Sequence, residues 1–128
     1  MTPFSIDITV PKSAIDAMGH VNNVVYLQWA QDVAEQHWIS KTTPEHNTRY
    51  AWVVVNHFID YKHSAFEGEV LVLETWIERY TSATSERHTH IRRKKDGQLL
   101  VAAKTTWCFL DRQTEKPTRI PEEVRDLF

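Results

Sequence analysis

The residues best suited to chemistry lie in a polar turn at residues 16–23, with the sequence Asp-Ala-Met-Gly-His-Val-Asn-Asn. The turn supplies a carboxylate at Asp16, an imidazole at His20 and side-chain amides at Asn22 and Asn23. A carboxylate can attack a carbonyl carbon or act as a base that activates water. Either asparagine can cap a helix by accepting from its first-turn amides. The neighbouring backbone N–H groups can then stabilise an oxyanion that develops on a carbonyl.

A helix must follow and position this turn, because the next residues have a helical apolar period. Apolar residues recur on one side from Val24 to Ile39, and polar residues gather on the other. The apolar arc is wide, so we expect the helix to be mostly wrapped by other structure. The carboxylate of Asp16 would then lie beside the electropositive end of a buried helix, which suits chemistry on a carbonyl.

Five other segments have the alternation typical of strands. They are residues 5–10, 51–61, 70–79, 84–94 and 99–110. The segment 51–61 contains Val53, Val54 and Val55, apolar on both faces, and is therefore expected at the centre of a sheet. The polar segment 41–47, which includes Pro44, is expected to be a loop, and residues 95–98 a hairpin turn.

These elements predict an α+β fold in which a curved antiparallel sheet of about five strands wraps around one long central helix. A chain of 128 residues without an internal repeat or linker is expected to form one domain over residues 1–128. One helix covers only one face of a sheet. We therefore expect a second copy to cover the remaining surface, in a homodimer or homotetramer.

Composition narrows the class of protein. Hydrophobic residues make up 41% of the chain and charged residues 25%, as in ordinary globular proteins, and the net charge of −2 gives no reason to expect nucleic-acid binding. The lone Cys108 excludes an intramolecular disulfide and fits a reducing compartment. No apolar run reaches the length of a membrane span, and the start has no signal-peptide pattern. These features predict a cytoplasmic protein that does not bind membranes.

The pattern Asp16-x-x-Gly19-His20-Val21-Asn22-Asn23-x-x-Tyr26-Leu27 resembles the signature of the 4-hydroxybenzoyl-CoA thioesterase family of hotdog-fold proteins. It is also similar to the acyl carrier protein (ACP) thioesterases related to that family. Two further segments match the family: residues 57–61 together with 65–68, and residues 110–124. The resemblance covers nearly the whole chain, and its first motif is the specific one.

This resemblance implies a hotdog thioesterase that hydrolyses an acyl-CoA or acyl-ACP thioester to a free acid and a thiol, without a cofactor or metal. It assigns Asp16 as the catalytic carboxylate, either as nucleophile or as general base, and His20 as a second catalytic residue. The substrate-binding and oxyanion positions implied by the motif are Gly19, Asn22, Asn23 and Tyr26. Gly19 is expected where a side chain would obstruct the approach of substrate to the helix.

Two positions depart from the acyl-ACP thioesterase pattern. Met18 replaces an asparagine that lies between the aspartate and the histidine, and Ser64 stands about where those enzymes have a glutamate. Asp16 is therefore the residue that the resemblance supports best.

Several other residues have alternative interpretations. The basic run Arg92, Arg93 and Lys94 is usually an exposed strand end, but it could contact coenzyme A phosphates or an acidic carrier protein. His88 and His90 have a spacing that could bind a metal, although a solvated strand face is favoured. Cys108 lies in an apolar strand and is expected to be a packed thiol.

Two other functions remain open at this point. A hydratase or dehydratase on the same scaffold would pair a histidine with an acid in motifs that are spaced differently. A non-catalytic acyl-CoA-binding protein would use the same pocket without needing Asp16.

Overall fold

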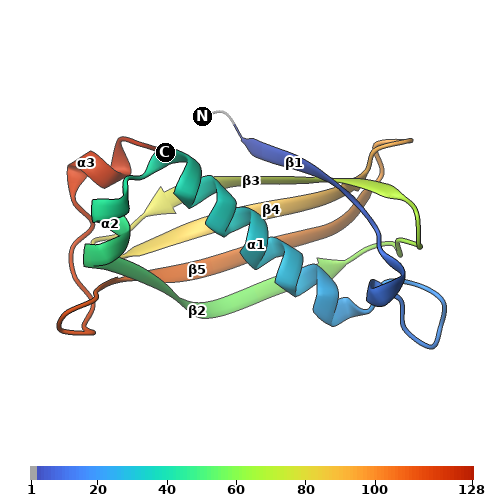
Figure 1. Cartoon of the computed structure of the whole chain (residues 1–128), viewed down its shortest axis with the longest axis horizontal. Helices are drawn as coiled ribbons and strands as arrows, with labels where there is room; N and C mark the ends of the chain where they lie inside the picture. The colour runs from blue at the N-terminus through green and yellow to red at the C-terminus, as the bar shows by residue number, and fades with distance from the viewer. Residues whose placement is uncertain (1–2) are drawn as a thin grey trace.

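The computed structural model describes residues 3–128, in which one long helix lies against a five-stranded antiparallel sheet (Figure 1). Met1 and Thr2, which begin the stretch examined for a signal peptide, lie outside the described residues. In chain order, the elements are β1 (Phe4–Thr9), the 3-10 helix η1 (Lys12–Ala14), α1 (Asn23–Lys41), α2 (Pro44–Arg49), β2 (Tyr50–Tyr61), β3 (Val70–Tyr80), β4 (Thr84–Arg93), β5 (Leu99–Asp111) and α3 (Glu122–Arg125). The strands are ordered β1-β3-β4-β5-β2, so β1 and β2 form the two edges.

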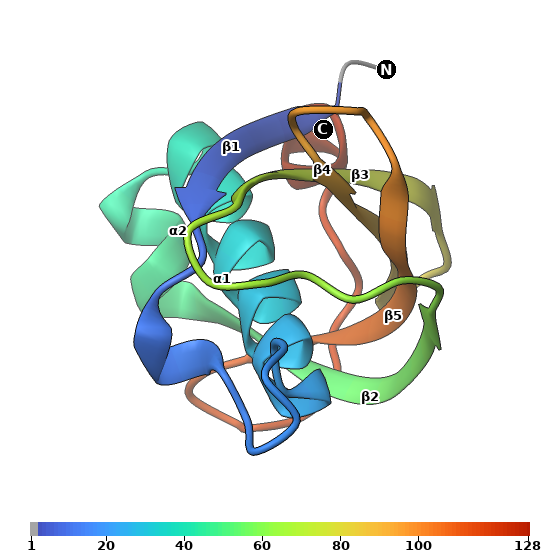
Figure 2. The same ribbon diagram turned by 90° about the vertical axis from the view of Figure 1, so that its right-hand side faces the viewer.

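The sheet curves around α1, as the end-on view in Figure 2 shows. Strand β3 illustrates why: Leu71, Leu73, Thr75 and Ile77 alternate inward and are buried. The inner faces of the strands pack against Tyr26 and Val33 of the helix to form the main core. This is the hotdog fold, and the prediction of an α+β sheet wrapped around one helix is confirmed.

A second, smaller core lies at the C-terminal end of α1. It contains Tyr50 at the start of β2, Phe109 near the end of β5, and Ile120 and Val124 from the C-terminal segment. Trp38 of α1 packs against this group. In the described part of the chain, no helix is both long and apolar enough to cross a bilayer.

The predicted strand ranges agree with the observed ones to within a residue or two, but the expected loop at residues 41–47 is wrong in part. Helix α2 begins at Pro44, a residue type that more often indicates a loop. Proline is favourable at the first position of a helix because the N–H it lacks would have no partner there. The Thr43 side chain accepts from the His46 N–H and caps this helix.

The expected central position of β2 is also wrong, because β2 pairs only with β5 and lies at the edge of the sheet. Val53 and Val55, read as buried on both sides, are 44% and 57% exposed, and Phe58 is 68% exposed. A register shift between Val54 and Asn56 interrupts the alternation of the strand. The apolar run at residues 53–55 therefore lies on an exposed edge strand and not on a central strand.

The N-terminal end of α1 is fixed to the segment between β2 and β3. The Tyr26 hydroxyl, on a side chain only 3% exposed, accepts a hydrogen bond from the Ala65 N–H at 2.9 Å. The Val21 N–H donates to the Ala65 carbonyl at 3.0 Å, so both polar groups of Ala65 are used. Burial raises the pKa of Tyr26, which keeps the phenol neutral at this position.

Replacing Tyr26 by phenylalanine is expected to lower the free energy of unfolding by about 1–3 kcal/mol, because the buried Ala65 N–H loses its acceptor. Urea unfolding at one fixed protein concentration would measure the loss. Tyr61→Phe is the matched control, since within residues 3–128 the Tyr61 hydroxyl makes only an exposed bond of 3.3 Å to the Asn23 carbonyl. Equal effects of the two substitutions would contradict this role for Tyr26.

Candidate active site

The turn that carries Asp16 is closed by backbone hydrogen bonds. Ile15 and Val21 form an isolated β-bridge, and the Asp16 N–H donates to the His20 carbonyl at 2.9 Å. Gly19 has φ of +86°, a left-handed conformation that favours glycine. A Cβ there would meet no protein atom within 4 Å. Within the protein itself, the requirement for glycine is therefore the backbone dihedral and not the space around it.

The Asp16 carboxylate has one oxygen held by the turn and one oxygen turned toward the imidazole. Oδ1 accepts from the Met18 N–H at 2.9 Å, whereas Oδ2 lies 3.7 Å from His20 Nδ1. The side chain is 26% exposed, so it is oriented by the turn and still accessible. His20 Nδ1 also lies 3.5 Å from the Val21 carbonyl. Both neighbours are acceptors, which favours a proton on Nδ1.

Asn22, and not Asn23, caps helix α1. The Asn22 side chain accepts from the Val24 N–H at 3.0 Å, and its own N–H donates to the Ala14 carbonyl. Asn23 is the first residue of the helix, and its N–H has no acceptor among residues 3–128. A helix N-terminus with an unused N–H donor therefore follows the Asp16 turn directly.

The sequence model of the thioesterase-like superfamily matches residues 10–128, which is nearly the whole chain. The chain belongs to this superfamily. It is a thioester hydrolase, as the motif that begins at Asp16 indicated.

Individual relatives agree with this assignment. Over 116 residues the thioesterase is 26% identical to the long-chain acyl-CoA thioesterase FadM of Escherichia coli, covering 88% of this chain and 86% of that protein. It is 27% identical over 84 residues to the chloroplastic acyl-[acyl-carrier-protein] hydrolase FATB3 of Cuphea viscosissima, covering 65% of this chain but only 20% of that protein. The structure of SAV2348 from Staphylococcus aureus in complex with CoA superposes with a TM-score of 0.90 at 18% identity, covering 99% of this chain and 83% of that one.

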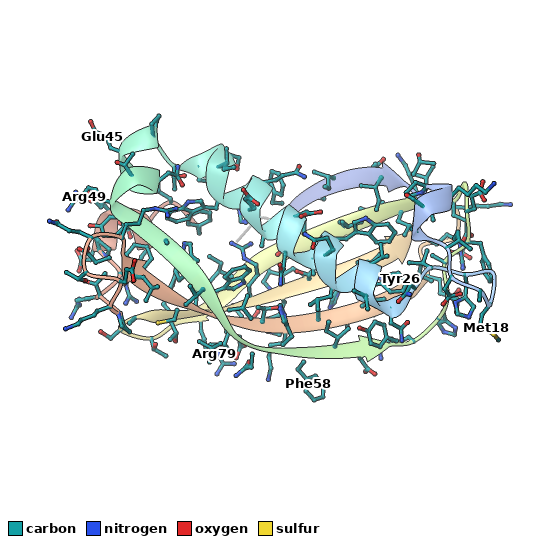
Figure 3. The ribbon with its side chains drawn as sticks, turned by 60° about the horizontal axis from the view of Figure 1, so that its bottom comes forward. Met18, Tyr26, Glu45, Arg49, Phe58 and Arg79 are labelled. Atoms are coloured by element: carbon teal, nitrogen blue, oxygen red, sulfur yellow. The ribbon has the colours of Figure 1, made fainter. Side chains whose placement is uncertain are left out.

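The structure gathers most of the sequence-predicted site residues of the thioesterase into one place. Asp16, Gly19, His20, Asn22 and Asn23 all belong to the turn and the first helical position. Figure 3 shows the exposed Met18 of this turn at one end of the molecule. Tyr26 lies one helical turn further on, and its hydroxyl is engaged with the backbone of Ala65.

The basic run predicted to contact phosphates is partly used inside the protein. Arg93 donates to Glu69 at 2.6 Å, to the Ser64 carbonyl at 3.0 Å, and to Asp96 and Gln98 in the β4–β5 hairpin. Arg93 therefore holds this hairpin against the β2–β3 segment. Arg92 donates to the Gly97 carbonyl at 3.3 Å, and Lys94 pairs with Asp7 of β1.

The remaining predicted alternatives are placed on the outer face of the sheet. His88 and His90 pack against Trp76, and His88 also contacts Glu86 at 2.9 Å. In residues 3–128, no three potential metal-ligating side chains come together. The Cys108 thiol is half-buried and contacts the Phe109 carbonyl, as expected for a packed residue.

Sequence reasoning missed a cavity with a volume of about 730 Å³. It lies between the C-terminal half of α1 and the strands, away from the Asp16 turn. Its walls include three tryptophans (Trp38, Trp52 and Trp107) and polar side chains of α1 and β4 (Gln31, Ser85 and Arg87). One feature of β4 could have indicated this cavity. The inward positions Ser85, Arg87 and Thr89 are polar although they are buried.

Two histidines of α1 and β2 lie beside these polar groups. His37 is buried, and its Nδ1 accepts from Arg87 Nη1 at 2.9 Å. Burial lowers the pKa of His37 to about 4, and the charges of Arg87 and Lys41 act in the same direction. On β2, His57 contacts Thr105 and Gln31, and burial lowers its pKa too.

The lowered pKa of His37 predicts how stability depends on pH. An unfolded histidine takes up its proton below about pH 6.5, whereas folded His37 resists protonation until about pH 4. Between these values the unfolded chain binds more protons, so stability should rise with pH across this window. The contribution of His37 is up to about 3 kcal/mol.

Unfolding free energies measured from pH 4 to pH 7 would test this contribution. His37→Gln retains an acceptor for Arg87 but does not titrate, so its curve should be flatter than that of the wild type. The exposed His63→Gln substitution is the control, because it removes a histidine without touching the contact between Arg87 and His37. A His37→Gln curve that runs parallel to the wild-type curve would contradict the assignment.

Proposed function

We propose that this thioesterase hydrolyses acyl-CoA or acyl-ACP substrates with Asp16 as the catalytic carboxylate. One observation supports this most strongly: Asp16 Oδ2 lies in the turn that leads directly into a helix N-terminus with an unused N–H donor. This arrangement provides an anionic oxygen and an oxyanion donor in neighbouring parts of the chain. Two relatives are named for hydrolysis of long-chain acyl-CoA and of acyl-ACP, and they support both types of thioester as substrates.

In the proposed reaction, the thioester carbonyl oxygen accepts from the Asn23 N–H, and the helix dipole stabilises the negative charge that develops on it. Asp16 either attacks the carbonyl carbon to give a mixed anhydride, which water then hydrolyses to the free acid and Asp16, or removes a proton from a water that attacks the thioester itself. In both routes the C–S bond breaks and the thiolate leaves. A thiol pKa of about 8.5 makes this departure possible without a strong acid. His20, 3.7 Å from Oδ2, orients the carboxylate.

Asp16→Asn tests the catalytic assignment, because it retains the shape of the side chain and removes its charge. We expect kcat to fall by at least about 10²-fold, the scale of losing one positioned acid–base group. Acyl-CoA binding should persist, since the helix amides remain. Asp126→Asn is the matched control: this exposed carboxylate follows helix α3, outside both the Asp16 turn and the β2 edge. Hydrolysis at the wild-type rate by Asp16→Asn would remove the basis of the proposal.

The two roles of Asp16 can be separated by a single turnover in ¹⁸O-water with excess enzyme. Label in the Asp16 carboxylate is expected if an anhydride forms and water cleaves it at the Asp16 carbonyl, whereas water activation places label only in the product acid. We favour the nucleophile, because the neighbouring N–H donor activates the thioester for direct attack.

We also propose that the thioesterase is a dimer or larger, joined through the free edges of β2. Val53, Val55 and Phe58 expose apolar side chains along this strand, and Figure 3 shows Phe58 pointing away from the sheet. Antiparallel pairing of two β2 strands would place the Tyr61 end of one beside the Tyr50 end of the other. Tyr61 contacts the start of α1. The catalytic turn of one copy would thus approach the large cavity of the other.

Replacing both Val55 and Phe58 by aspartate should disrupt this contact. Light scattering is expected to show monomers where the wild type shows dimers or larger species, and activity should fall with the loss of assembly. Val70→Asp is the control, because Val70 is an exposed apolar residue that is not on the β2 edge. A wild-type protein that is monomeric and fully active would rule out this assembly.

The proposal also covers the basic run at residues 92–94, the extent of the domain and its cellular location. We assign the contacts with coenzyme A phosphates, or with an acidic carrier protein, to Arg92 and Lys94, with Arg93 supporting their hairpin from within. Residues 1–128 act as one catalytic domain. The single cysteine supports placement in the cytoplasm.

A further inference from the structure

The large cavity contains a buried positive charge that the catalytic proposal does not use. Arg87 lies on the inner face of β4, is 5% exposed, and lines the cavity. Its hydrogen bonds run from Nη1 alone, to His37 Nδ1 at 2.9 Å and to the Thr75 hydroxyl at 3.2 Å. Nε and Nη2 of the guanidinium make no hydrogen bond to residues 3–128. Three of its five N–H donors therefore remain for a ligand.

This charge has no anionic partner in the described chain. None of the ion pairs formed by residues 3–128 includes Arg87. His37, which accepts from it, is a neutral imidazole. Burial lowers the pKa of Arg87 to about 10, which still leaves the guanidinium charged at neutral pH. A buried charge without a counter-ion is costly, and an anion in the cavity would relieve that cost.

A second unused donor lies in the same cavity. The indole Nε1–H of Trp107 is buried and has no acceptor within the described residues. An indole N–H can only donate, so this group also requires an acceptor. Trp38 and Trp52 supply large apolar surfaces in the cavity. The combination fits a ligand with an apolar chain that ends in an anionic group rich in acceptors.

The acidic residues of the cavity lie nearer to solvent than Arg87 does. Glu35 is exposed, and the partly exposed Asp32 accepts a hydrogen bond from Gln28. Arg112 also lines the cavity, and its Nε donates to the Asn47 carbonyl. Solvent screens the charges at the mouth of the cavity much more than it screens Arg87. The inner end of the cavity therefore favours an anion.

We propose that the cavity binds the acyl part of the substrate, and that Arg87 recognises a second carboxylate carried by the acyl chain at a distance from the thioester. The substrate class is then the ω-carboxyacyl thioesters, the half-thioesters of dicarboxylic acids. This inference rests on the proposed thioesterase function and on the proposed pairing of β2 edges, which brings the catalytic turn of one copy toward the cavity of the other, and it specifies the substrate. Carboxylate fits better than a neutral hydroxyl or ketone, because only an anion both accepts from the guanidinium and neutralises it.

The turnover test compares each ω-carboxyacyl-CoA with the plain acyl-CoA of the same carbon number, over a series of chain lengths. At the best length, the wild type should have a kcat/KM at least about 10-fold higher for the ω-carboxy substrate, as one charge-assisted contact provides. Arg87→Met should reduce this ratio to about 1 or below. The exposed Arg79→Met, on the neighbouring strand and labelled in Figure 3, is the control and should keep the wild-type ratio.

The ratio separates recognition from a structural role, because a loss of packing changes both substrates alike. A wild type that prefers the plain acyl-CoA at every length would overturn the inference while leaving the thioesterase proposal intact. An unchanged ratio in Arg87→Met would do the same. If Arg87→Met does not fold, the wild-type ratio of the two kcat/KM values still tests the inference. Trp107→Phe should then lower that ratio.

A binding experiment tests the anion site even if no thioester is hydrolysed. Fluorescence of the cavity tryptophans would report the binding of an alkyl carboxylate and of the alcohol with the same chain. The wild type should bind the carboxylate at least about 10-fold more tightly, and Arg87→Met should abolish the difference. Equal affinities in the wild type would overturn the anion site, whereas absence of hydrolysis with all substrates would instead overturn the proposed function.

Discussion

The hydrogen bond from the Ala65 N–H to the Tyr26 hydroxyl determines where the catalytic turn lies relative to the sheet. Tyr26 is in the first turns of α1, so this bond fixes the end of the helix that bears the unused Asn23 N–H. The same Ala65 accepts from Val21 with its carbonyl, which fixes the last part of the Asp16 turn as well. One residue between β2 and β3 thus positions both the candidate carboxylate and the candidate oxyanion donor. The apolar core around Tyr26 excludes the water that would otherwise compete for these bonds.

The two ends of α1 have different chemistry. At its N-terminal end the packing is apolar, and the Asn23 N–H and Asp16 Oδ2 are the polar groups that remain for substrate. Along its C-terminal half the inner face of β4 is polar, with Ser85, Arg87 and Thr89 buried beneath the helix. Burying such residues lowers stability, and Thr75 and His37 offset only part of that cost. Function explains this arrangement better than stability does, because an apolar strand would pack at least as well.

Most of the fold could be predicted from the sequence because each strand has a clear alternation and the helix has a wide apolar arc. The candidate site was predictable for a different reason: Asp16, His20 and the asparagines are adjacent in the chain, so one motif contains them. The cavity was not predictable, since its walls come from α1, β2, β3, β4 and β5 and depend on how these elements pack. The edge position of β2 was missed because a run of apolar residues is buried only if other parts of the protein cover it, and the sequence does not show whether they do. Helix α2 was missed because Pro44 can end one element or begin the next.

The exposed edge of β2 also has a consequence for how the chain reaches its folded state. This strand is twelve residues long, and its outer edge presents backbone donors and acceptors that no strand within residues 3–128 of the same copy pairs. Until another copy covers it, such an edge can add any extended segment of a partly folded neighbour. Refolding from denaturant should therefore give the best yield at intermediate concentration. Very dilute chains leave the edge uncovered, and concentrated ones pair it with the wrong strand and precipitate.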